Sequence, residues 1–116
     1  MIFKTTDAPE FYIDEGCFIR ELMNVASLPH LSISQARVKV GKTTELHTLT
    51  GDEIYYILKG TGEVTVGENT PQFVEPGTVV YIRAQQAQQI KNSGAEDLLF
   101  LCICTPRFEA KDYRSL

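Results

Sequence analysis

The chain has 116 residues, a formal net charge of −4 and 43% hydrophobic residues. This length is enough to bury one hydrophobic core, so we expect a single domain. The eleven Lys and Arg residues are scattered along the chain. That scatter argues against a nucleic-acid partner, because a surface for duplex nucleic acid needs clustered positive charge.

No apolar stretch approaches the ~20 residues that a membrane span requires. The first residues also lack the basic segment and apolar run of a signal peptide. We therefore expect a cytoplasmic protein with no membrane partner. Three cysteines, an odd number, fit reduced thiols better than a disulfide framework. Cys102 and Cys104 share one face of an apolar run, and Leu99, Leu101 and Ile103 share the other. Because both faces are apolar, the sequence leaves open which one points inward.

Residues 1–30 are expected to form an N-terminal arm or edge strands. Two short apolar pieces around Pro9 fit either edge strands or an arm laid over the body or over a neighbouring subunit. The segment CFIRELM, residues 17–23, predicts a strand. The segment at 24–30 contains Pro29 and predicts a loop.

Residues 31–108 read as a succession of short strands, each closed by Gly, Pro or Asn. Strands are expected at 33–40, 53–58, 63–67, 72–75, 78–82, 88–92 and 98–104. Turn signals at this density, with no convincing long helix, predict an all-β sandwich or barrel. The last residues, 109–116, are expected to form a polar tail with room for one short helical turn.

One imidazole and one carboxylate stand close together in this pattern. His47 lies in a Thr-rich segment, and Glu53 opens the alternating strand EIYYIL six residues later. Alternate residues of a strand share a face. If the intervening turn preserves parity, these two side chains point the same way as Leu49 and Tyr55. Such a pair begins either a metal site or an acid–base pair.

The stretch from Gly41 to Gly60 resembles the first motif of the cupin superfamily, whose members are small jelly-roll barrels. That motif runs Gly, five residues, His-x-His, three or four residues, Glu, six residues and Gly. His47 and Glu53 stand at the first His and the Glu, with every spacing kept. Leu49 stands where the second His belongs.

The stretch from Gly77 to Asn92 is similar to the second cupin motif, and its spacing is also kept. Arg83 takes the place of the motif proline, Gln85 that of the motif glycine, and Gln88 that of the motif histidine. The resemblance implies an all-β fold, a double-stranded β-helix (jelly-roll) cupin barrel. It implies no activity by itself.

The resemblance gives the domain organisation. We expect the barrel over residues 31–108, the N-terminal arm at 1–30 before it and the C-terminal tail at 109–116 after it, as one domain overall.

The resemblance also implies a divalent-metal site, because cupins of known chemistry usually hold one metal with the motif histidines and the glutamate. Carried over by position, the ligands here are His47, Glu53 and Gln88. An amide oxygen binds metal weakly compared with imidazole or carboxylate, and Leu49 offers no ligand atom. A weakly held metal is therefore expected, with Zn, Ni, Mn and Fe left open.

The expected function is the binding of a small polar molecule in the barrel cavity, with Tyr55, Leu49 and Ile90 lining the pocket. One alternative is a metal-dependent isomerase, lyase or oxygenase acting on a sugar-like or carboxylated substrate. Another is a non-catalytic dimeric structural or sensing module whose site is vestigial. In a metal-free pocket, His47 and Glu53 would hydrogen-bond each other. The sequence leaves open whether the chain is an enzyme.

A homodimer is expected, because residues 1–23 carry more apolar surface than an arm readily leaves in water. A short jelly-roll barrel also has edge strands that need covering. The alternative is an arm that folds back over its own barrel. The apolar residues of the arm are Ile2, Phe3, Phe11, Tyr12, Ile13, Phe18 and Ile19.

Overall fold

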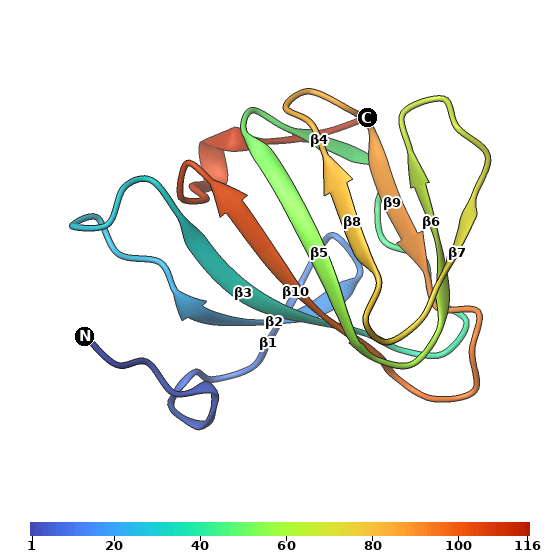
Figure 1. Ribbon diagram of the computed structural model, residues 1–116, viewed down its shortest axis with the longest axis horizontal. Coiled ribbons are helices and arrows are strands. Elements are labelled where there is room, and N and C mark those ends of the chain that lie inside the picture. Colours follow the sequence, from blue (N-terminus) through green and yellow to red (C-terminus); the bar gives the residue numbers. More distant parts are fainter.

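The computed structural model describes residues 1–116 as two antiparallel β-sheets that lie against each other (Figure 1). In spatial order, the six-stranded sheet contains β1 (Phe11–Ile13), β2 (Cys17–Met23), β3 (Ser32–Val38), β10 (Leu98–Thr105), β5 (Asp52–Lys59) and β8 (Val79–Ile82). The five-stranded sheet contains β11 (Tyr113–Ser115), β4 (His47–Leu49), β9 (Gln88–Lys91), β6 (Gly62–Val66) and β7 (Gln72–Val74).

The helical content is limited to two 3-10 turns, η1 (Thr5–Asp7) and η2 (Ala110–Asp112). None of the helices is long and apolar enough to cross a membrane. The strands predicted at residues 17–23 and between residues 33 and 104 are present, and the short strand β4 at residues 47–49 was not predicted as a strand.

Strand β10 runs between β3 and β5 and settles which of its faces points inward. Leu98, Phe100, Cys102 and Cys104 are buried, while the alternating residues between them are only partly buried. The two cysteines therefore lie on the inner face. All three cysteines of the chain are buried and free, as expected for reduced thiols.

The hydrophobic core lies between the sheets and takes side chains from both. Its buried members are Cys17, Ala36, Val38, Tyr55, Ile57, Val64, Val74, Ile82, Ile90, Leu98, Phe100 and Cys102. Burial of this apolar surface is the main term that holds the two sheets together.

The N-terminal arm joins the barrel of its own chain. Strand β1 pairs with β2, and β2 pairs with β3, with Ile19 opposite Ala36. The C-terminal tail departs from the expected polar extension. After the short turn at η2, residues 113–115 form β11 and pair with β4, because the chain returns alongside an edge strand that has free backbone groups.

Glycines in the two cupin motif stretches, residues 41–60 and 77–92, adopt backbone conformations that other residues avoid. Gly60 has φ +82°, and a Cβ there would lie 2.7 Å from the carbonyl oxygen of Asp97. Gly77 has φ +89°. Gln85, which replaces a motif glycine, keeps a left-handed backbone with φ +68°. The fold thus preserves the turn even where the glycine is lost.

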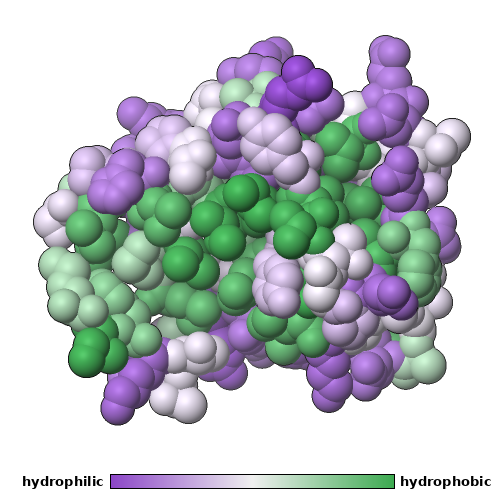
Figure 2. Space-filling model, viewed as in Figure 1, coloured by the Kyte–Doolittle hydropathy of each residue, from purple (hydrophilic) through white to green (hydrophobic).

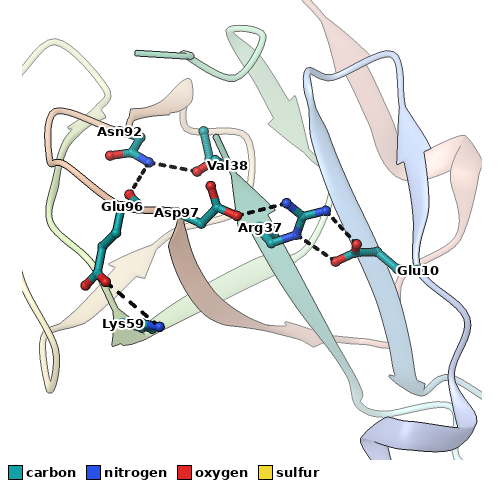
Figure 3. A network of polar contacts seen from close by, with 7 residues as sticks. All are labelled: Glu10, Arg37, Val38, Lys59, Asn92, Glu96 and Asp97. Carbon is teal, nitrogen blue, oxygen red and sulfur yellow. Dashed lines mark hydrogen bonds and ion pairs between the residues drawn. The ribbon is translucent and has the colours of Figure 1, made fainter. Parts of the chain in front are cut away.

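A polar network ties the arm to the barrel (Figure 3). Arg37 on β3 donates to Glu10 through Nη2 at 2.6 Å and through Nε at 3.0 Å, and its Nη1 lies 2.9 Å from Asp97 Oδ2. Beside it, the buried Asn92 donates to the carbonyl oxygens of Val38 and Glu96, both at 2.8 Å. The arm and the β9–β10 loop are therefore both fixed to β3.

The six-stranded sheet exposes apolar side chains on its outer face. In Figure 2 an apolar band crosses the face that β3, β10 and β5 occupy in Figure 1. The exposed apolar residues of this sheet include Tyr56 and Leu58 on β5, and Val79 and Tyr81 on β8. They alternate with the buried residues of the same strands, such as Ile57 and Ile82.

Candidate functional site

A cavity of about 120 Å³ lies on the inner side of the six-stranded sheet. Thirteen of its 21 lining residues are hydrophobic, and none is Lys or Arg. Its ionisable oxygen and nitrogen groups are His47, Glu15, Glu53, Glu21 and two tyrosines. The cavity is therefore apolar over most of its wall and acidic in its charged groups.

His47 on β4 is almost fully buried, and its ring is fixed from two sides. Its Nδ1 lies 2.7 Å from the carbonyl oxygen of Glu45, so Nδ1–H donates there and Nε2 carries the lone pair. The ring stacks on Tyr113 of β11 with centroids 4.6 Å apart. Burial lowers the pKa of His47, which keeps the imidazole neutral.

Glu15 approaches His47 from the turn between β1 and β2. Its Oε1 lies 3.3 Å from His47 Nε2, and its backbone carbonyl accepts a hydrogen bond from the Glu45 N–H at 2.7 Å. Burial, with added repulsion from Glu53 and Glu45, raises the pKa of Glu15 to about 8. A protonated Glu15 can then donate to His47 Nε2, so that both partners are neutral.

Glu53 on β5 is the second buried carboxyl of the cavity, with 7% of its surface exposed. The Cys104 thiol donates to its Oε2 at 3.6 Å. Burial raises the pKa of Glu53 to about 7, while Gln88, Cys104 and Cys102 beside it offset part of that rise. Near neutral pH, this carboxyl is therefore close to the midpoint of its titration.

Gln88 on β9 lies behind the cavity wall, opposite His47 in the sheet register. It is fully buried. Its Oε1 accepts a hydrogen bond from the Tyr55 hydroxyl, but its Nε2 has no hydrogen-bond partner, alone among the buried side-chain nitrogen and oxygen atoms. A buried donor without a partner costs free energy and needs an explanation.

The predicted site residues are brought to one region but not to one centre. His47, Glu53, Tyr55 and Leu49 line the cavity. Ile90 is instead fully buried in the hydrophobic core. His47 and Glu53 are not hydrogen-bonded to each other, because Glu15 is the acidic group beside Nε2.

These side chains do not form a ready-made metal site. No three His, Cys, Asp or Glu side chains come close enough together to hold a metal ion. Gln88 already uses Oε1 to accept from Tyr55, and Leu49 forms apolar wall where a second imidazole would stand. The donor set therefore does not fit a divalent cation as the side chains lie.

Two site residues, Glu15 and Tyr113, lie outside the two cupin motif stretches and were not predicted from the sequence. Glu15 sits in a turn, where no periodicity tells which way a side chain points. Tyr113 belongs to the tail that pairs with β4. The only available signal was the Glu15-Gly16 turn between two apolar segments. It predicts a turn but does not predict where the Glu15 side chain points.

The two facing sheets, the glycine-bounded frames and the inward-facing His47 and Glu53 define a cupin-type jelly roll. The chain belongs to the cupin family: the family model described as a cupin domain matches residues 34–104. This confirms the family and the all-β jelly-roll class predicted from the two motifs.

Two proteins are similar to this chain over 84% and 55% of its length. An uncharacterised protein of Methanocaldococcus jannaschii is 37% identical over 101 residues, which cover 84% of this chain and 80% of that protein. A glucose-6-phosphate isomerase of Thermococcus gammatolerans is 41% identical over 68 residues, 55% of this chain and 35% of the isomerase.

Solved structures show the same fold at lower identity. The crystal structure of a predicted oxalate decarboxylase of Thermotoga maritima superposes with a TM-score of 0.82 at 20% identity. The superposition covers 91% of this chain and 99% of that one. At this identity the likeness shows the fold and leaves the activity open.

Proposed function

We propose that this cupin binds a small molecule with an apolar body and no negative charge in the cavity bounded by Glu15, His47 and Glu53. The observation that carries the proposal is the composition of the cavity wall, which has three carboxyl groups and no Lys or Arg. An anion there would meet acidic groups without a cationic partner, whereas an uncharged or cationic ligand would not.

The size of the cavity limits the ligand. Its volume of about 120 Å³ is somewhat below the roughly 150 Å³ of an engineered apolar cavity that accepts benzene. A ligand of about five to seven non-hydrogen atoms fits that space. Most of its surface would touch apolar side chains, with one polar group at the acidic end.

This ligand class differs from what the names of similar proteins suggest. Glucose 6-phosphate and oxalate are both anions, and proteins commonly recognise such groups with Arg or Lys. The cavity offers neither. The proposed ligand is also less polar than the small polar or carboxylated molecule expected from the sequence.

A divalent metal at His47, Glu53 and Gln88 is not part of this proposal, because the donor set does not fit one. A melting-temperature series with Zn²⁺, Ni²⁺ and Mn²⁺ tests the metal separately. We expect wild type and the variant His47→Ala/Glu53→Ala to respond alike. A metal-induced rise that only wild type shows would restore the metal site.

The proposed function is tested by ligand-observed NMR with small apolar molecules of positive, zero and negative charge. We expect binding of uncharged or cationic molecules only. Ala36 lies buried on the cavity wall, so Ala36→Leu fills the space and should abolish binding. The matched control is Ala84→Leu, because Ala84 is exposed. Preferred binding of anions, or equal binding by the Ala36→Leu protein, would contradict the proposal.

A further inference from the structure

Glu15 and Glu53, the two inner carboxyls of the cavity, have no Lys or Arg partner, although other partly buried acids of this protein do. Glu10 and Asp97 share Arg37, and Glu109 lies near Arg107 and Lys111. Glu15 and Glu53 line one cavity, and repulsion from Glu53 adds to the cost of ionising Glu15. A buried carboxyl without a cationic partner favours its neutral form, so a cation that enters the cavity would stabilise the ionised form.

The donors beside Glu53 suit an ionised carboxylate. They are the Cys104 thiol at 3.6 Å and the buried Gln88 amide, which lowers the pKa of Glu53 and whose Nε2 has no other hydrogen-bond partner. Donors stabilise an ionised carboxylate better than a neutral acid. The surroundings of Glu53 are thus arranged for a negative charge that the protein alone does not balance.

The walls beside the carboxyls suit an organic cation. Tyr55 and Phe100 lie together with ring centroids 4.7 Å apart, and Tyr113 covers the His47 ring. All three aromatic rings line the cavity. Aromatic faces attract cations, and their apolar edges bury the carbon part of a ligand.

We propose that the ligand presents an alkylammonium group to Glu15, Glu53 and His47 Nε2. The proposal rests on the proposed function and adds the chemical class of the polar group. An ammonium carries three N–H donors. Once Glu15 is ionised, the cavity offers it three acceptors: two carboxylates and His47 Nε2, which carries the lone pair because Nδ1–H is bonded to the Glu45 carbonyl.

An organic ammonium fits this cavity better than a metal cation does. A metal ion needs several ligand atoms at about 2.0–2.6 Å around one point, and no three candidate side chains converge in that way. An ammonium donates hydrogen bonds over the longer distance of about 2.7–3.2 Å, and the rest of the ligand brings an apolar body to the hydrophobic wall.

Three probes of nearly equal shape test the charge preference by calorimetry: 3-methylbutylamine, 3-methylbutan-1-ol and 3-methylbutanoate. For wild type we expect the amine to bind at least tenfold more tightly than the alcohol, and no binding of the carboxylate. Glu15→Gln and Glu53→Gln should each weaken amine binding at least tenfold and change alcohol binding less than twofold. Glu63→Gln, at an exposed position on β6, is the matched control and should behave as wild type.

The outcomes separate this inference from the proposed function. If the alcohol binds wild type as tightly as the amine, the ammonium proposal is wrong while cavity binding stands. If the amine binds with equal affinity to wild type and both amide variants, the ammonium does not sit between these carboxyls. If neither probe binds, both proposals fail. The three probes measured on wild type alone test the preference for an ammonium group, even where a variant does not fold.

Discussion

The contacts of His47 determine which of its ring nitrogens carries the proton and which one faces Glu15. The Nδ1–H of His47 is committed to the Glu45 carbonyl at 2.7 Å, and Nε2 faces Glu15 at 3.3 Å. Because burial disfavours charge on both groups, the neutral acid and the neutral imidazole are the favoured forms. In the free protein, the protonated Glu15 therefore donates a hydrogen bond to His47 Nε2. When a cation enters, Glu15 loses this proton and both groups act as acceptors.

The first prediction concerns pH and stability. Glu15 and Glu53 have folded-state pKa values of about 8 and about 7, above the ordinary 4.5. Their contribution to stability is therefore complete below pH 4.5 and is lost as pH rises to about 8. The two shifts together correspond to a loss on the order of 8 kcal/mol, at about 1.4 kcal/mol per pKa unit.

Urea midpoints between pH 5 and pH 8 measure this effect. We expect wild type to lose stability over that range more steeply than Glu15→Gln/Glu53→Gln, because the double variant has no carboxyl there to ionise. The comparison with the variant removes the contribution of His47, whose lowered pKa acts in the opposite direction at acidic pH. Parallel curves for the two proteins would contradict the prediction.

The second prediction concerns Gln85, whose φ of +68° is unfavourable for a side chain with a Cβ. Its backbone N–H is held by the Leu49 carbonyl at 2.8 Å, so the turn keeps this conformation. Gln85→Gly should raise the free energy of unfolding by about 0.5–1 kcal/mol in urea denaturation, since glycine adopts this φ freely. Gln85→Ala keeps the Cβ and should bring no gain. An equal gain from both variants would show that side-chain removal, and not backbone strain, is responsible.

Individual site residues were predictable where a periodic strand carried them. Glu53 and Tyr55 reach the cavity wall because alternation along β5 fixes their face, whereas the cupin motif spacing assigned His47 and Leu49 on the fully buried strand β4. Glu15 was not predictable in that way. Its position depends on how a turn of the arm docks against β4, which is a long-range contact and leaves no local pattern.

At the scale of elements, the β1–β2 hairpin completes the site. It brings Glu15 to the cavity and also contributes Ile13, Cys17 and Ile19 to the wall. The hairpin is held by its pairing with β3 and by the ion pair between Glu10 and Arg37 (Figure 3). Anything that loosens the hairpin should therefore weaken ligand binding as well as stability.

The third prediction uses Arg37→Met to test how much the Arg37 contact stabilises the hairpin in urea denaturation. Arg37 and Glu10 are about one-fifth exposed, and hydrogen bonds to partly buried charged groups contribute about 1.5–3 kcal/mol each. We expect Arg37→Met to lower the free energy of unfolding by roughly 1–3 kcal/mol. Lys59→Met is the control, because Lys59 and Glu96 are exposed and 3.9 Å apart, a pair of little value. Equal effects of the two substitutions would count against the hairpin contact.

The order of the strands was predictable only in part. Apolar runs, turn residues and alternation located the strands between residues 17 and 105 except β4, because these signals are local. The cysteine face of β10 stayed open, since Cys102 and Leu101 are both apolar and only the packed sheets distinguish them. The pairing of β11 with β4 was missed, because a polar three-residue strand carries no hydrophobic pattern.

At the scale of the whole molecule, we propose that two copies of the chain form a homodimer. The arm still exposes Ile2, Phe3, Phe11 and Tyr12 although β1 and β2 have joined the barrel. The outer face of the six-stranded sheet adds a second exposed apolar surface (Figure 2). Exposed apolar groups of this extent are typical of an interface, and a two-fold contact is the simplest way to cover them.

Light scattering behind a sizing column checks the dimer prediction. We expect twice the chain mass of 13.0 kDa, and weaker association for Ile2→Lys/Phe3→Lys. Val79→Lys places a charge on the sheet face instead, where Val79 is exposed, and serves as the comparison. Weakening by Val79→Lys alone would move the interface from the arm to the sheet. A species of chain mass at micromolar concentration would exclude the dimer.

The central claim is that Glu15 and Glu53 share one apolar cavity with no cation to balance them. The most direct measurement is an NMR titration of the side-chain carboxyl carbons in ligand-free protein, assigned with Glu15→Gln and Glu53→Gln. We predict midpoints of about 8 for Glu15 and about 7 for Glu53. Midpoints of both carboxyls near the ordinary 4.5 would contradict the claim, because they would mean that water or a cation already stabilises the ionised forms.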